Sequence, residues 1–116
     1  MKKVSAQEPL KHYQWGEGCD GWNLVDESSL SVKKERMPAG TAEALHYHKK
    51  AQQFFFILKG SATFEIDNEK IIISEQEGIH IQPGQKHRII NHTVTAIEFI
   101  LSSQPSTADD RVNLSS

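Results

Sequence analysis

The sequence lacks several features that would place the protein outside the cytoplasm. It contains a single cysteine, Cys19, so no internal disulfide can form, and we expect a reducing compartment. Its longest apolar run, Phe54 to Leu58, has five residues, which is too short to span a membrane. The N-terminus carries two lysines but no apolar segment of the kind found in signal peptides. These absences predict a cytoplasmic protein that does not bind membranes.

A strong charge of either sign is also missing. The chain has 13 Lys and Arg against 15 Asp and Glu, a net charge of −2, and no long basic block. This balance argues against a nucleic-acid partner. With 116 residues the chain forms one domain. A domain of this size buries about two thirds of its unfolded surface, which is enough for a core.

Short segments with strand character recur along the chain, and no segment has a helical period. They are separated by turns of about two to six residues, which is the range of hairpin connections. Many short strands with Gly and Pro turns are typical of an all-β sandwich or barrel. Besides the region around residues 46–58, the predicted strands are 22–25, 29–37, 61–66, 70–74, 78–81, 86–91 and 94–101. We expect a loosely ordered N-terminal arm over 1–21, a barrel over 22–102 and a polar C-terminal tail over 103–116.

Two histidines one residue apart, His46 and His48, are the first candidate functional residues. Residues i and i+2 share one face of a strand, whereas on a helix they lie about 200° apart, so one ion can bind both rings only on a strand. Lys49 to Gln52 would form a polar hairpin loop. Such a loop would place Gln53 opposite His48, where cross-strand Cβ atoms are about 5 Å apart.

A third histidine, His87, follows the turn at Pro83 and Gly84 and begins a predicted strand. If that strand lies beside the hairpin, its ring joins the other donors. The predicted metal ligands are His46, His48, Gln53 and His87. Three imidazoles and one oxygen donor suit one divalent transition metal, such as Zn, Fe, Ni, Cu or Mn, and leave room for water or substrate. The alternatives are histidines that hold no metal, or a three-histidine site in which Gln53 only contacts a ligand.

These residues resemble the two motifs of a small single-domain cupin. The first motif is Gly-x5-His-x-His-x3-4-Glu-x6-Gly, and its matches are Gly40, His46, His48 and Gly60, with Gln53 at the Glu position. The second is Gly-x5-Pro-x-Gly-x2-His-x3-Asn, and its matches are Gly84, His87 and Asn91. Pro83 lies one place later than the motif proline, and Gln76 replaces the leading glycine. The resemblance covers about residues 22 to 102.

The resemblance implies a cupin-type antiparallel β-barrel, also described as a double-stranded β-helix or jelly roll. It does not specify a reaction, because cupins include isomerases, dioxygenases, lyases, storage proteins and sensors. The pattern His-x-His-x4-Gln is similar to that of cupins that ketonise unsaturated uronates. Small cupins commonly dimerise, and the second apolar face of the Phe54 to Leu58 strand needs a cover, so we expect a homodimer.

The leading functional hypothesis is a metal-dependent enzyme acting on a small oxygen-rich molecule, such as a sugar, uronate or keto acid, by Lewis-acid isomerisation or ketonisation. Glu98, between Ile97 and Phe99, is the candidate general base, and the alternative is that it faces solvent. Because successive residues of a strand point to opposite faces, we expect Tyr47 and Arg88 to point away from the metal ligands. An iron-dependent dioxygenase with the same ligands and a non-catalytic binding or sensor protein are the competing hypotheses.

Overall fold

The computed structural model describes residues 1–114, and its regular structure is entirely β. The strands are β1 (Lys11–Trp15), β2 (Cys19–Glu27), β3 (Leu30–Met37), β4 (His46–His48), β5 (Gln52–Lys59), β6 (Ala62–Ile66), β7 (Glu69–Ile73), β8 (Gly78–Ile81), β9 (His87–Ile90), β10 (Ile97–Gln104) and β11 (Arg111–Asn113). No helix within the described residues has the length and apolar character needed to cross a membrane. The predicted all-β class is confirmed.

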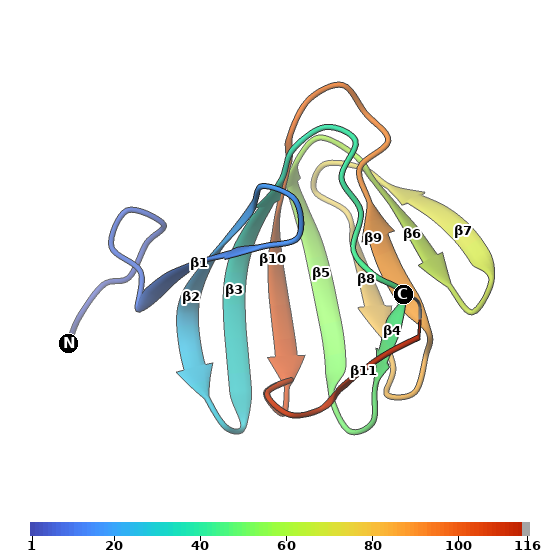
Figure 1. Cartoon of the computed structure of the whole chain (residues 1–116). Helices are drawn as coiled ribbons and strands as arrows, with labels where there is room; N and C mark the ends of the chain where they lie inside the picture. Colours follow the sequence, from blue (N-terminus) through green and yellow to red (C-terminus); the bar gives the residue numbers. More distant parts are fainter. Residues whose placement is uncertain (115–116) are drawn as a thin grey trace.

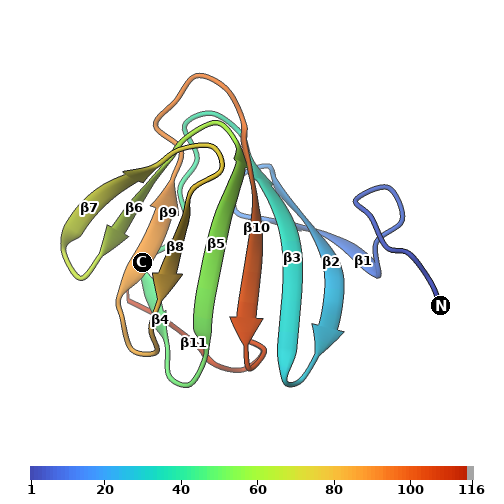
Figure 2. The ribbon, with the colours of Figure 1, turned by 180° about the vertical axis from the view of Figure 1, so that it is seen from behind.

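Two antiparallel sheets face each other and form the cupin-type jelly roll that the sequence predicted (Figure 1). One sheet has the strand order β1-β2-β3-β10-β5-β8, and the other has the order β11-β4-β9-β6-β7. Seen from behind, β1 lies at one edge of the molecule and β7 at the opposite edge (Figure 2). Neighbouring strands that are distant in sequence, such as β3 and β10, bring the two ends of the chain into one sheet.

The space between the sheets changes from polar to apolar along the strands. On β5 the inward residues are Gln53, Phe55 and Ile57, because alternate residues of a strand share a face. On β10, Ser103 lies opposite Gln53 and Phe99 lies opposite Ile57, so the two strands change character in the same direction. The buried apolar cluster consists of Cys19, Met37, Phe55, Ile57, Ala62, Phe64, Ile73, Ile81, Ile89, Ile97, Phe99 and Leu101.

The N-terminal segment differs from the loosely ordered arm expected over residues 1–21. Strand β1 and the start of β2 lie in this segment and extend the six-stranded sheet. Gly16 and Gly18, at φ of 52° and 76°, form the turn between them in a backbone conformation that favours glycine. Trp15 packs against the core, which fixes β1 on the sheet. The glycines that suggested disorder therefore mark a hairpin turn.

The C-terminal segment is also more ordered than the polar tail expected over 103–116. Strand β11 pairs with β4 at the edge of the five-stranded sheet. Just before it, the Asp110 carboxylate accepts hydrogen bonds of 2.9 to 3.1 Å from backbone N–H groups of the loop between β4 and β5. These contacts bring the segment against the barrel. Residues 115–116 of the predicted tail lie outside the described residues.

The predicted hairpin between His48 and Gln53 is wrong in its pairing. Strand β4 pairs with β9 and β11, whereas β5 pairs with β10 and β8 in the other sheet. Both edges of each strand are occupied, so the loop between β4 and β5 crosses from one sheet to the other. Gln53 therefore approaches the histidines across the barrel interior. The other predicted strands coincide with β2, β3 and β6 to β10, with bounds that differ by a few residues.

Candidate metal centre

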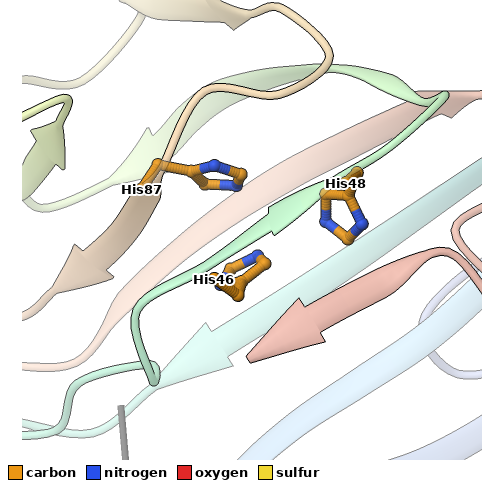
Figure 3. A group of neighbouring side chains, drawn as sticks. All are labelled: His46, His48 and His87. Carbon is orange, nitrogen blue, oxygen red and sulfur yellow. The ribbon is translucent and has the colours of Figure 1, made fainter. Parts of the chain in front are cut away.

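Three buried histidines converge at the polar end of the barrel. His46 and His48 are supplied by β4, and His87 begins β9 directly opposite His46. One ring nitrogen of each residue lies within 4.8 Å of the corresponding nitrogens of the other two. Figure 3 shows the three rings turned toward a common space. The structure thus brings together the three histidines that the sequence analysis singled out.

Backbone carbonyls fix two of these rings with one nitrogen free. His46 Nδ1 donates to the Ala44 carbonyl oxygen at 2.8 Å, and His87 Nδ1 donates to that of Gln85 at 2.8 Å. In a neutral ring this leaves the lone pair on Nε2, as in metal-binding histidines held by a carbonyl. Burial lowers the pKa of His46 and of His48 to about 4, and burial also lowers the pKa of His87. The rings are therefore in the neutral form that binds metals.

The third ring has an unsatisfied nitrogen. His48 Nδ1 is buried, and no residue of the described chain forms a hydrogen bond with it. A buried polar atom without a partner costs about 1–3 kcal/mol. A bound ion, or a water molecule on such an ion, would give this nitrogen a partner and so remove the cost.

Gln53 joins the histidines from the opposite sheet. Its Oε1 lies 3.1 Å from His87 Nε2, and its Nε2 donates to Ser103 Oγ at 3.1 Å. With the His87 proton on Nδ1, the two facing atoms are both acceptors, so a cation between them is favourable. Their separation suits neighbouring ligands of one ion with bonds of about 2.1 Å. The donor set therefore fits a divalent transition metal.

A cavity of about 250 Å³ opens beside these ligands. The residues that line it are Tyr13, Trp15, Lys33, Glu35, Glu43, His46, His48, Gln53, Leu101, Thr107 and Arg111. Several are ionisable side chains that the sequence analysis missed, among them Tyr13 from the expected arm, Lys33 and Glu35 from the predicted strand 29–37, and Arg111 from the expected tail. The cavity is thus built by strands from both ends of the chain.

Tyr13 and Glu35 form a hydrogen-bonded pair on the cavity wall, in which the tyrosine hydroxyl donates to Glu35 Oε2. Burial raises the pKa of Glu35 to about 7, against the opposing effect of this hydrogen bond. Burial, followed by the nearby Glu35 charge, also raises the pKa of Tyr13. The cavity therefore contains a carboxyl group that can gain or lose a proton near neutral pH.

Glu43 and Arg111 form a second polar pair in the cavity. Arg111 Nη1 lies 3.3 Å from Glu43 Oε2, while Glu43 Oε1 lies 3.8 Å from His46 Nδ1. Burial raises the pKa of Glu43, and the Arg111 charge opposes this shift. The pair links the C-terminal strand β11 to the segment that precedes β4.

Glu98, the predicted general base, lies outside the cavity. On β10 the buried residues Ile97 and Phe99 flank it, so its side chain is on the outer face of the sheet. There it forms an ion pair of 3.0 Å with Lys34. The structure thus corrects the expected inward orientation, and we do not retain Glu98 as a catalytic candidate. Arg88 also points away, as predicted, and pairs with Glu65 at 2.7 Å.

A protein-family model described as the cupin domain matches residues 33–102, more than half of the chain. The uncharacterized protein MJ1618 of Methanocaldococcus jannaschii is 28% identical over 83 residues, which are 72% of this chain and 66% of that protein. The chain thus spans less than two thirds of this relative's length.

Solved structures with the same fold include enzymes. The polyketide cyclase RemF from Streptomyces resistomycificus superposes with a TM-score of 0.84 and 14% identity, covering 98% of this chain and 85% of RemF. Streptomyces Pac13, described as a nucleoside dehydratase, gives a TM-score of 0.81 and 14% identity, covering 99% of this chain and 92% of Pac13. At this identity the likeness establishes the fold alone.

Proposed function

The chain belongs to the cupin family, and from that premise we propose that it is a metal-dependent enzyme acting on a small oxygen-rich molecule. The reaction class we propose is isomerisation or ketonisation of a sugar, uronate or keto acid. The observation that carries the proposal is the buried cluster of three histidines, joined by Gln53, at the edge of a cavity that also contains ionisable groups.

His46, His48, Gln53 and His87 are the proposed ligands of one divalent transition metal, with Zn, Fe, Ni, Cu and Mn as candidates. Such an ion acts as a Lewis acid that draws electron density from a substrate oxygen. All four proposed ligands are uncharged, so they do not reduce the charge of the ion. Ser103 holds the Gln53 amide, and backbone carbonyls hold the His46 and His87 rings, so the donors are oriented before a substrate arrives.

The cavity contains two cationic groups that could bind an anionic part of a substrate, beside the carboxyl groups of Glu35 and Glu43. Lys33 and Arg111 line the cavity, and Arg111 also forms an ion pair with Glu43. Lys33 Nζ lies 5.4 Å from the centre of the Tyr13 ring. A carboxylate of a uronate or keto acid would find a cationic partner here. Two enzymes that share the fold, a polyketide cyclase and a nucleoside dehydratase, also favour a catalytic role.

Metal analysis of untagged protein, followed by a substrate screen, tests this proposal. We expect about one ion per chain and, with the metal-loaded protein in D2O, deuterium incorporation beside the carbonyl group of a uronate or keto acid, measured by NMR. Oxygen uptake with the same compounds would instead support the iron-dependent dioxygenase. Binding without turnover would support the non-catalytic sensor or binding protein.

We also propose that the protein is a cytoplasmic homodimer that associates through the outer face of β5. Phe54 is 43% exposed on this face, and its ring lies 6.4 Å from that of Phe56. An exposed phenylalanine beside a half-buried one favours association. A reducing compartment is consistent with the free thiol of Cys19. Sedimentation at micromolar concentration tests the dimer, and a particle of 13.1 kDa would exclude it.

A further inference from the structure

Tyr13, Gly21 and Glu35 form a row across three neighbouring strands. Tyr13 is paired with Gly21 between β1 and β2, and Gly21 is paired with Glu35 between β2 and β3. A Cβ atom at Gly21 would lie 2.0 Å from Cζ of the Tyr13 ring. The ring therefore lies over the glycine, and its hydroxyl reaches the carboxyl group two strands away. Only a residue without a side chain permits this arrangement.

This row faces the metal ligands that come from the other sheet. Tyr13 and Glu35 line the cavity together with His46 and His48, which belong to the five-stranded sheet. Within residues 1–114, Tyr13 is the hydrogen-bond partner of the Glu35 carboxyl group and occupies Oε2. The second oxygen, Oε1, remains for a molecule in the cavity. The pair thus lies on the wall that a ligand at the histidines would contact.

We propose that Glu35 is the residue that transfers protons to and from the substrate, and that Tyr13 orients its carboxyl group. This inference rests on the proposed function and assigns its acid–base step. The Glu35 carboxylate takes the proton from a carbon next to the substrate carbonyl. The electron pair of that C–H bond forms a C=C bond, and the π pair of the carbonyl moves to its oxygen. The resulting carboxylic acid then returns the proton to carbon, so no oxidant or reductant is consumed.

The surroundings of Glu35 suit both directions of this transfer. Burial raises the pKa of its carboxyl group to about 7, so the acid and the base are both populated near neutral pH. The hydrogen bond from Tyr13 stabilises the carboxylate and holds one oxygen in place. Glu98 provides the matched comparison, because it is the same residue type on the opposite face of the same sheet and pairs with Lys34.

The test compares Glu35→Gln and Tyr13→Phe with the control Glu98→Gln, all loaded with metal. The measurement is NMR of deuterium exchange into pyruvate, 2-oxoglutarate and glucuronate in D2O, with metal content determined on the same samples. We expect Glu35→Gln to lose about 100-fold or more in exchange rate at unchanged metal content. The control should stay within about twofold, because general acid–base effects require a group in the cavity.

Tyr13→Phe separates an orienting role from a structural one. Removing the hydroxyl should slow exchange by about tenfold, the size expected for a hydrogen bond to a charged group. It should also move the acidic limb of the pH–rate profile to higher pH, because the hydrogen bond lowers the pKa of Glu35. A structural role alone would leave that limb in place. If Glu35→Gln does not fold, the pH–rate profile of Tyr13→Phe tests the inference instead. An acidic limb at the same pH as in wild type would then overturn the inference.

The remaining outcomes distinguish the inference from the proposed function. Equal exchange by wild type and a folded, metal-loaded Glu35→Gln protein would overturn the role of Glu35 and leave the function standing. No exchange by the metal-loaded wild type with any of the three compounds would overturn both.

Discussion

The two ends of the barrel interior are equally buried but differ in chemistry. At one end Ile57, Phe64 and Phe99 are fully inaccessible, and at the other His46 and His87 are almost as completely buried. The same strands serve both ends, since β9 carries both His87 and Ile89 and β5 carries both Gln53 and Ile57. Burial alone therefore does not identify the core of this fold.

The energetics of the two ends are opposite. Apolar side chains gain free energy when they leave water, whereas imidazole, amide and carboxyl groups lose hydration that their partners replace only in part. Among the described residues, the buried side-chain atoms without a hydrogen-bond partner are Ser31 Oγ, Glu43 Oε1 and His48 Nδ1, and all three belong to the polar end. The apolar end therefore supplies most of the stabilisation of the fold, whereas the polar end costs stability, which is the pattern expected where a fold carries a functional site.

The largest effect should come from opening a cavity at the apolar end. Phe64→Ala removes a ring that packs on Phe55 at a centroid distance of 5.0 Å. We expect the free energy of unfolding to fall by about 3–5 kcal/mol, with the metal content per folded chain unchanged. Urea unfolding of metal-free protein and elemental analysis measure the two quantities. Loss of the metal from folded Phe64→Ala protein would show that the two ends are not independent.

The next largest effect should be a pH dependence of folding stability that arises from Glu35 at the polar end. Because the folded-state pKa of Glu35 is raised from 4.5 to about 7, its contribution is fully present below pH 4.5 and is lost as the pH rises through 7. The charged and titratable groups that interact with it are Tyr13, Cys19, Lys33, Glu43 and Arg111. Over this pH interval the free energy of unfolding of wild type should fall by on the order of 3 kcal/mol relative to that of Glu35→Gln. Urea unfolding of both metal-free proteins at several pH values checks this, and parallel curves would contradict it.

Removal of one imidazole should separate metal binding from stability. His48→Ala should weaken metal affinity by about 100-fold, since even outer partners of metal ligands contribute about 10–100-fold. The metal-free protein should change little in stability, because the deleted ring carries an unsatisfied buried nitrogen. Competition with a chelator and urea unfolding measure these effects. Full metal affinity in the variant would mean that His48 is not a ligand.

The smallest predicted change concerns the amide ligand. Gln53→Glu adds a negative charge beside the ion, so we expect about tenfold tighter metal binding, and Gln53→Ala should bind more weakly. Catalysis that depends on Lewis acidity should slow in Gln53→Glu despite its tighter metal. Affinity measured for all three proteins in one buffer tests this order. Equal affinities of the three proteins would mean that Gln53 is not a ligand and that the site consists of the three histidines alone.

The sequence predicted the cluster of three histidines better than the cavity around it. The spacing of His46 and His48 and the turn before His87 depend on local geometry, which strand period and turn chemistry determine. Gln53 was predicted as a ligand through a hairpin that does not exist. It lies beside His87 because its strand faces β9 across the interior. The position of Gln53 beside the histidines was thus inferred correctly from a strand pairing that is wrong.

The proposed acid–base residues escaped prediction because their position at the cavity depends on register between distant strands. The segment 29–37 carries charges on both faces, so alternation alone does not show which face is inward. The same ambiguity made Glu98 attractive, although the residue that faces inward is Glu35. Tyr13 and Arg111 lie in segments whose composition suggested disorder, and only pairing with the sheets places them at the cavity.

The most direct test is a crystal structure of untagged, metal-loaded protein with diffraction data collected at the absorption edge of the metal. Our account predicts one anomalous peak within about 2–2.3 Å of a ring nitrogen of His46, His48 and His87 and of Gln53 Oε1. It also predicts that the cavity beside the ion reaches the Glu35 carboxyl group. No peak between these residues, or a peak held elsewhere on the chain, would contradict the assignment of the polar end as a metal site.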